Sequence, residues 1–121
     1  SKKSKHINKA IKIYNTENIK PSKELAEKTQ CTVKSLEKIV NKGRGAYYSS
    51  GSRPNQTAES WGIARLASAI TGGNTVFYDF HILDEGCNKK GKAYTLAKRT
   101  CKNKKRCGKY LNRTKKHHIR M

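Results

Sequence analysis

Residues 22–43 carry the sequence SKELAEKTQCTVKSLEKIVNKG, in which two short apolar patterns are separated by a turn. Ser22 and Thr32 are typical N-cap residues, each placed directly before one of these patterns. The patterns predict helices at 23–29 and 33–42, each with its apolar side chains on one face. The stretch therefore predicts a helix-turn-helix-like pair as the centre of the fold.

The turn of this pair departs from the usual helix-turn-helix. Gln30 stands where glycine is usual, so it must adopt a left-handed conformation or the turn must be of another kind. Gly43 is expected to end the second helix as its C-cap. If the motif binds DNA, the residues that would face the groove or its phosphates are Lys34, Ser35, Lys38, Asn41 and Lys42. The alternative is a pair that packs for stability alone.

The flanking segments predict further helices. Apolar spacing favours a short helix at 6–14, and a helix at 58–71 should be capped by Thr57 and stopped by two glycines. Residues 75–83 fit both a strand and a helix, and helix is favoured because no second strand is evident to pair with it. The expected fold is a mainly α, small single domain, and the alternative is α+β with a short strand at 75–83.

Residues 43–56 form the least regular stretch, with glycine, serine, arginine and proline in close succession. This composition predicts an ordered Gly/Ser/Arg loop rather than a long helix or strand. An aromatic pair beside arginines, formed by Arg44, Tyr47, Tyr48 and Arg53, is expected to stack bases or clamp phosphate there. The alternative is that the tyrosines and Trp61 belong to the core and the polar side chains hold the loop in place.

The charge of the chain is concentrated at its two ends. The net charge is +20, and residues 87–121 carry fourteen basic side chains and no carboxylate. Residues 1–20 are also basic, whereas residues 21–86 are nearly neutral. We therefore expect a basic N-terminal helix or arm at 1–20, a helical domain at 21–86 and a basic C-terminal arm with one short helix at 87–121.

Such a charge distribution is typical of proteins that bind nucleic acid. The expected partner is DNA, bound with little sequence preference, and RNA is an alternative. A second hypothesis is an interaction protein whose basic surface meets an acidic viral or host protein. A basic tail that is merely solvated and has no partner is a less favoured alternative. The expected contact residues are Lys34, Lys38, Lys42, Arg44, Tyr48, Arg53, Lys98, Arg99, Lys102, Lys104, Lys105 and Arg106. Residues 102–106 also resemble a nuclear localisation signal.

The four cysteines have no C-x-x-C spacing, so neither a metal site nor a cofactor is expected. Free thiols in a reducing compartment are favoured. A disulfide between Cys101 and Cys107 is one alternative, and a zinc site using three cysteines with His117 and His118 is another.

Residues 42–66, KGRGAYYSSGSRPNQTAESWGIARL, are similar to an uncharacterised domain of small proteins from large DNA viruses, including giant viruses such as the marseilleviruses. The similarity extends over about 22–87. The resemblance implies a viral origin and is in keeping with a role in the virion or on the genome, and it implies no catalytic residues. Virion, host cytoplasm and host nucleus are the expected locations.

Catalysis and membrane insertion are not expected. A third hypothesis is a small nucleic-acid-processing enzyme that would use Asp79, His81, Arg53 and either Ser50 or Ser52. No Ser-His-Asp spacing or paired-carboxylate motif is visible, however. No apolar run approaches the roughly 20 residues that cross a bilayer.

Overall fold

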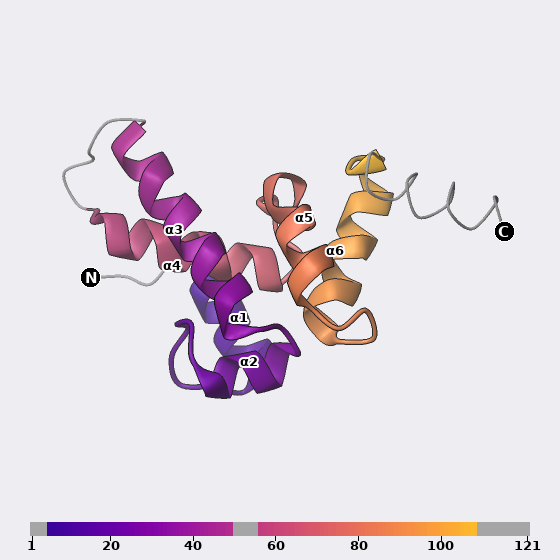
Figure 1. The fold of residues 1–121 in the computed structure, drawn as a ribbon, viewed down its shortest axis with the longest axis horizontal. Helices are drawn as coiled ribbons and strands as arrows, with labels where there is room; N and C mark the ends of the chain where they lie inside the picture. Colours follow the sequence, from indigo (N-terminus) through magenta and orange to yellow (C-terminus); the bar gives the residue numbers. More distant parts are fainter. Residues whose placement is uncertain (1–4, 50–55, 109–121) are drawn as a thin grey trace, which may run out of the picture.

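The computed structural model describes residues 5–49 and 56–108. These residues form a mainly α fold, and a lone antiparallel bridge between Cys31 and Cys87 is their only β pairing. The strand expected as an alternative at 75–83 is absent, because this segment is helical. The helices are α1 (Lys5–Tyr14), α2 (Lys23–Thr29), α3 (Val33–Ser49), α4 (Ala58–Ile70), α5 (Val76–Gly86) and α6 (Lys92–Asn103) (Figure 1).

The predicted helix starts are confirmed by their caps. Ser22 Oγ accepts a hydrogen bond from the backbone N–H of Leu25 at 3.1 Å, and Thr32 Oγ1 accepts one from Ser35 at 3.1 Å. Thr57 caps α4 in a reciprocal arrangement with Ser60. Gln30 adopts the left-handed conformation, with φ 60°, so the turn between α2 and α3 tolerates the missing glycine. Local side-chain chemistry thus determines where these helices begin.

The expected end of α3 at Gly43 is wrong, because the helix continues through Gly43 and Gly45 to Ser49. The predicted loop at 43–56 is therefore helical over its first half, and residues 50–55 lie outside the described residues. Gly43 is buried where α3 crosses α4. A Cβ on Gly43 would lie 2.7 Å from the Cα of Gly62, so the glycine serves close helix packing rather than helix termination.

We predict opposite effects from alanine at two of these glycines. A Cβ on Gly62 would lie 2.6 Å from the backbone oxygen of Val40, so Gly62→Ala should destabilise the fold by about 1–3 kcal/mol. Gly45 has open space around it, so Gly45→Ala should stabilise the fold by about 0.5–1 kcal/mol through helix propensity. Thermal melting followed by circular dichroism measures both, and a Gly62→Ala protein as stable as the wild type would contradict the close crossing.

The core extends into both basic end segments. On α1, Tyr14 is buried and its hydroxyl donates a hydrogen bond to the carbonyl oxygen of Ile70, and burial raises the pKa of this tyrosine. On α6, Ala93, Tyr94 and Ala97 are buried, with the Tyr94 ring 5.5 Å from that of Phe80. The expected boundaries at residues 20 and 86 therefore mark changes of charge, whereas the core crosses both of them.

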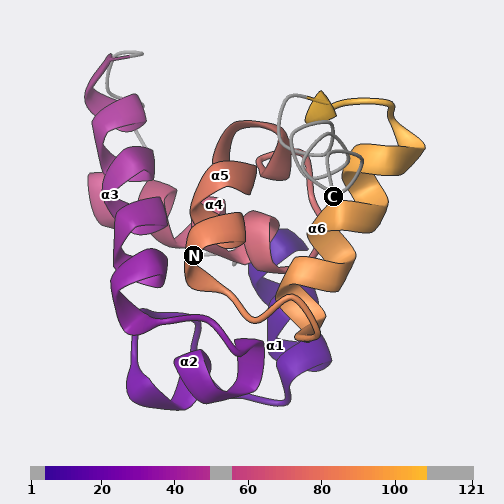
Figure 2. The ribbon, with the colours of Figure 1, turned by 45° about the vertical axis from the view of Figure 1, so that its right-hand side comes forward.

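The arrangement of α3, α5 and α6 positions the candidate sites. α5 lies between α3 and α6, and α1 and α2 lie together at one end of the molecule (Figure 2).

The helices of residues 5–49 and 56–108 include none with the length and apolar character required to cross a membrane.

The expectation of free thiols is wrong. Cys31 is bonded to Cys87, and Cys101 is bonded to Cys107, so no thiolate remains for a zinc site. The second pairing was the disulfide alternative, and it is confirmed. The first depends on backbone pairing between distant segments, in which Thr32 N donates to Gly86 O at 2.8 Å and Asn88 N donates to Gln30 O at 2.8 Å.

Candidate nucleic-acid interface

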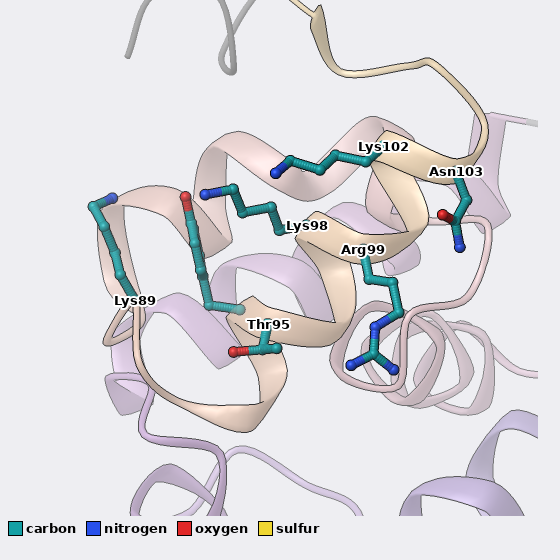
Figure 3. A pocket seen from close by; sticks show the side chains of 7 residues that line it. Lys89, Thr95, Lys98, Arg99, Lys102 and Asn103 are labelled. Atoms are coloured by element: carbon teal, nitrogen blue, oxygen red, sulfur yellow. The ribbon is translucent and has the colours of Figure 1, made fainter. Parts of the chain in front are cut away.

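A group of basic side chains without an acidic residue among them lies on α6. Lys98, Arg99 and Lys102 line a pocket of about 430 Å³ together with Lys89, from the segment before the helix (Figure 3). The other lining residues are Tyr94, Thr95 and Asn103, so no carboxylate takes part. We call the three cations Lys98, Arg99 and Lys102 the α6 cluster.

The α6 cluster faces outward because of the apolar pattern of the helix. Ala93, Tyr94, Ala97 and Cys101 recur at helical spacing and are buried against the rest of the domain. Arg99 and Lys102 are exposed between these positions and Lys98 is half-buried. Long basic side chains in such places keep their charge in water. The helix contains no acidic residue, so the cations are not neutralised within it.

Lys89 has a partner, whereas the α6 cluster has none among the carboxylates of the described residues. Lys89 Nζ lies 2.8 Å from Asp84 Oδ1, and this hydrogen bond raises the pKa of the lysine. Tyr94 donates to the same oxygen at 3.2 Å, and burial raises the pKa of Tyr94. The ion pairs of the described carboxylates do not include a member of the α6 cluster.

More cations follow directly after α6 in a loop closed by the Cys101–Cys107 disulfide. Lys104, Lys105 and Arg106 are exposed, and Arg106 stacks over the ring of Phe77, with its guanidinium carbon 4.3 Å from the ring centroid. The expected contact residues at 98–106 are thus brought together on one helix and the loop that follows it.

The expected contact residues on α3 are separated from the α6 cluster by α5, which lies between the two helices (Figure 2). Lys34 and Lys38 are exposed and line a smaller pocket of about 170 Å³, with Glu85 of α5 beside them. Ser35, which was expected to face the DNA groove, is buried, and a Cβ on Gly86 would lie 2.4 Å from its Cβ. The outer face of α3 is therefore partly covered by α5, unlike the recognition helix of a free helix-turn-helix.

Lys42 takes part in a buried ionic network. Asp79 is fully buried and accepts hydrogen bonds from Arg65 Nε and Nη2, both at 2.8 Å. Lys42 Nζ lies 3.2 Å from Asp79 Oδ1, and the hydrogen bond to Asp79 raises the pKa of Arg65. This network links α3, α4 and α5. Local spacing in the sequence does not indicate this network, because its members lie on three separate helices.

The remaining expected contacts surround the end of α3. Tyr48 is 68% exposed, and Arg44 lies 3.6 Å from a carboxylate oxygen of Glu59. Tyr47 is buried, donates to the carbonyl oxygen of Gln56 at 3.0 Å and packs edge-on against Trp61. Of the two tyrosines, only Tyr48 is therefore available to a ligand. Arg53 lies outside the described residues.

Asp79, the acidic residue considered for an enzyme, is engaged in the buried ionic network with Arg65. Both carboxylate oxygens of Asp79 are held by Arg65, so this group is not available as a general base. No group of three or more histidine, cysteine or acidic side chains in the described part of the chain has the arrangement of a metal site.

Comparison with known proteins identifies a family but no activity. No curated protein and no solved structure matches the chain. DUF5824, a family of unknown function, matches residues 1–81, which include α1 to α4 and the first part of α5. The α6 cluster and the disulfide-closed loop lie beyond the matched residues. Since the match covers more than half of the sequence, the chain belongs to the DUF5824 family.

Proposed function

We propose that this protein is a viral, virion-packaged, basic protein that binds DNA mostly without regard to sequence, and that it binds rather than catalyses. The observation that carries the proposal is the α6 cluster, in which three cations line one pocket with no carboxylate among the lining residues. Lys102 lies three and four residues from the other two, so these side chains are neighbours on the helix.

An anionic ligand would offset the repulsion between the like charges of the α6 cluster. Like charges three or four residues apart destabilise a helix by about 0.2–0.5 kcal/mol per pair. A DNA backbone supplies closely spaced phosphates that neutralise several cations and release condensed counterions. The disulfide-closed loop continues the cationic surface beyond the helix, which suits a ligand longer than a single phosphate.

The expected lack of sequence preference follows from the same surface. Contacts to phosphate fix position but carry no sequence information directly, whereas sequence is read at base edges in the grooves. The α3 face that would enter a groove is partly covered by α5, with Ser35 buried. Lys34 and Lys38 remain exposed and supply further phosphate contacts in this proposal.

Two observations support a virion location. Virion surfaces are among the oxidising environments in which disulfides persist, and all four cysteines are bonded. The resemblance of residues 42–66 to proteins of large DNA viruses favours a viral origin. The protein would meet the genome in the host cytoplasm or nucleus before packaging.

We predict that random duplex DNA binds with a steep salt dependence. Neutralising about six phosphates gives a slope near −5 in a plot of log affinity against log salt concentration. Fluorescence anisotropy with a labelled duplex, measured between roughly 50 and 300 mM salt, tests this. Undetectable binding at the lowest salt, or a slope near zero, would contradict the proposal.

Parallel titrations separate the other ligands. Single-stranded DNA and RNA of the same length show which nucleic acid is preferred, and polyglutamate represents an acidic protein partner. Binding of polyglutamate in the absence of any nucleic-acid binding would favour the interaction-protein hypothesis in place of the DNA-binding proposal.

A further inference from the structure

We infer that the Cys101–Cys107 disulfide controls DNA binding by holding the cationic loop after α6 in its binding conformation. The inference rests on the proposed function, and it assigns a regulation to the same site. It concerns residues 101–107, which contain four of the expected contact residues, Lys102, Lys104, Lys105 and Arg106.

The loop reverses the chain across the end of α6. Arg106 N donates to Cys101 O at 2.8 Å, and Lys105 N donates to Lys102 O at 3.1 Å. The disulfide joins two residues that are six positions apart. The cations are therefore presented from a closed loop whose two ends are held together covalently.

The backbone of this loop adopts conformations that its residues rarely take on their own. Lys105 and Cys107 have φ values of 53° and 61°, in the left-handed region that side chains other than glycine disfavour. Such conformations persist where the surrounding structure enforces them. At Lys105 the two backbone bonds above supply that enforcement, as in a Schellman C-cap. The disulfide and the stacking of Arg106 over Phe77 hold the rest of the loop.

Opening the disulfide would leave every charge in place and remove the constraint. The loop would then sample many conformations, and ordering it again on DNA would cost conformational entropy. The affinity should fall, while the number of phosphates neutralised in the complex stays nearly constant. Loss of organisation is thus distinguishable from loss of charge by the salt dependence.

The four cysteines differ in their accessibility to a reductant. Cys31, Cys87 and Cys101 are buried, whereas Cys107 is only partly buried. One thiolate of a dithiol reductant attacks Cys107 Sγ and forms a mixed disulfide with it. Cys101 leaves as a thiolate and takes up a proton. The second thiol of the reductant then displaces Cys107, so the reductant is oxidised to a disulfide and both cysteines become thiols. Cys101–Cys107 should therefore open before Cys31–Cys87.

The test compares binding of a random duplex by the oxidised protein, by the protein treated with dithiothreitol, and by Cys101→Ser/Cys107→Ser. Mass spectrometry of alkylated thiols identifies the reductant concentration at which only Cys101–Cys107 is open. We expect both altered forms to bind about tenfold more weakly at roughly 150 mM salt, with the salt slope changed by less than one phosphate contact.

A charge variant provides the matched control. Lys104→Gln/Lys105→Gln keeps the disulfide and should lower the slope by about 1.8, because two phosphate contacts are lost. Far-UV circular dichroism checks the fold of each form, and if the serine variant loses its helices the partly reduced wild-type protein decides the comparison.

Equal affinity of the oxidised and the reduced forms would overturn the redox inference and leave the proposed function intact. If the oxidised protein does not bind the duplex at all, the proposed function fails and the inference falls with it.

Discussion

Replacing Asp79 by asparagine should destabilise the fold by about 3–5 kcal/mol, because the substitution leaves the charge of Arg65 partly buried without its counter-ion. The Arg65 side chain is 15% exposed and the Asp79 side chain is fully buried, so water replaces the lost interaction poorly. For a domain of this size the melting temperature should fall by about 15 °C or more. Thermal unfolding followed by circular dichroism measures the effect.

A surface carboxylate serves as the matched control for Asp79→Asn. Glu59 is 65% exposed and lies 3.6 Å from Arg44, in an ion pair of the kind that contributes about 0–1 kcal/mol. Glu59→Gln should therefore change the melting temperature by only a few degrees. If Asp79→Asn melts no lower than Glu59→Gln, the ionic network between α3, α4 and α5 does not stabilise the fold.

Removing the α6 cluster should have the largest effect on DNA binding. Lys98→Gln/Arg99→Gln/Lys102→Gln deletes three phosphate contacts, so the salt slope should fall by about 2.7 and the affinity at roughly 150 mM salt by about a hundredfold. The three side chains lie on the outer face of α6 and have no carboxylate partner among the described residues, so the fold should be retained.

A triple variant on α1 tests whether position or total charge determines this loss. Lys5, Lys9 and Lys12 are exposed, and changing all three to glutamine gives the same net charge as the α6 variant. The α1 variant should retain most of the affinity. An equal loss in the two variants would show that DNA responds to the overall charge and that α6 has no particular role.

The sequence was sufficient to predict those parts of the fold that depend on neighbouring residues. Ser22 and Thr57 begin their helices through bonds to backbone groups three residues away, and such bonds can be inferred from local order. A helix rather than a strand was also predicted at residues 75–83, because a strand requires a pairing partner and none was evident, and α5 is that helix.

Two expectations were wrong, the helix end at Gly43 and the free thiols. In both, contacts between distant residues override the local preference of the sequence. Glycine is a residue typical of helix ends, which is why a helix end was expected at Gly43. The glycine is instead required because Gly62 of α4 approaches it closely, and α3 continues past it. Cys31 and Cys87 are 56 residues apart, and backbone bonds beside them join the two segments that carry the sulfurs. In both cases the deciding partner lies on another element.

The basic residues of the candidate site were predictable from the sequence, but the buried residues that anchor α6 to the domain were not. The run of cations from Lys98 to Arg106 was evident from the charge distribution, and the structure places it on a helix and a closed loop. The anchoring stripe of α6 was harder to recognise, because Ala93, Ala97 and Cys101 are small and lie among many lysines. Small buried residues carry little hydropathy signal even where they pack closely.

The Cys31–Cys87 bond also determines how the molecule would respond to mechanical force. It closes a covalent ring that contains α3, α4 and α5 and leaves α1, α2 and α6 outside it. Tension applied at the two ends of the chain passes from residue 31 to residue 87 through the sulfur atoms and bypasses the ring. The crossing of α3 and α4 is therefore shielded from pulling, and the outer helices bear the load.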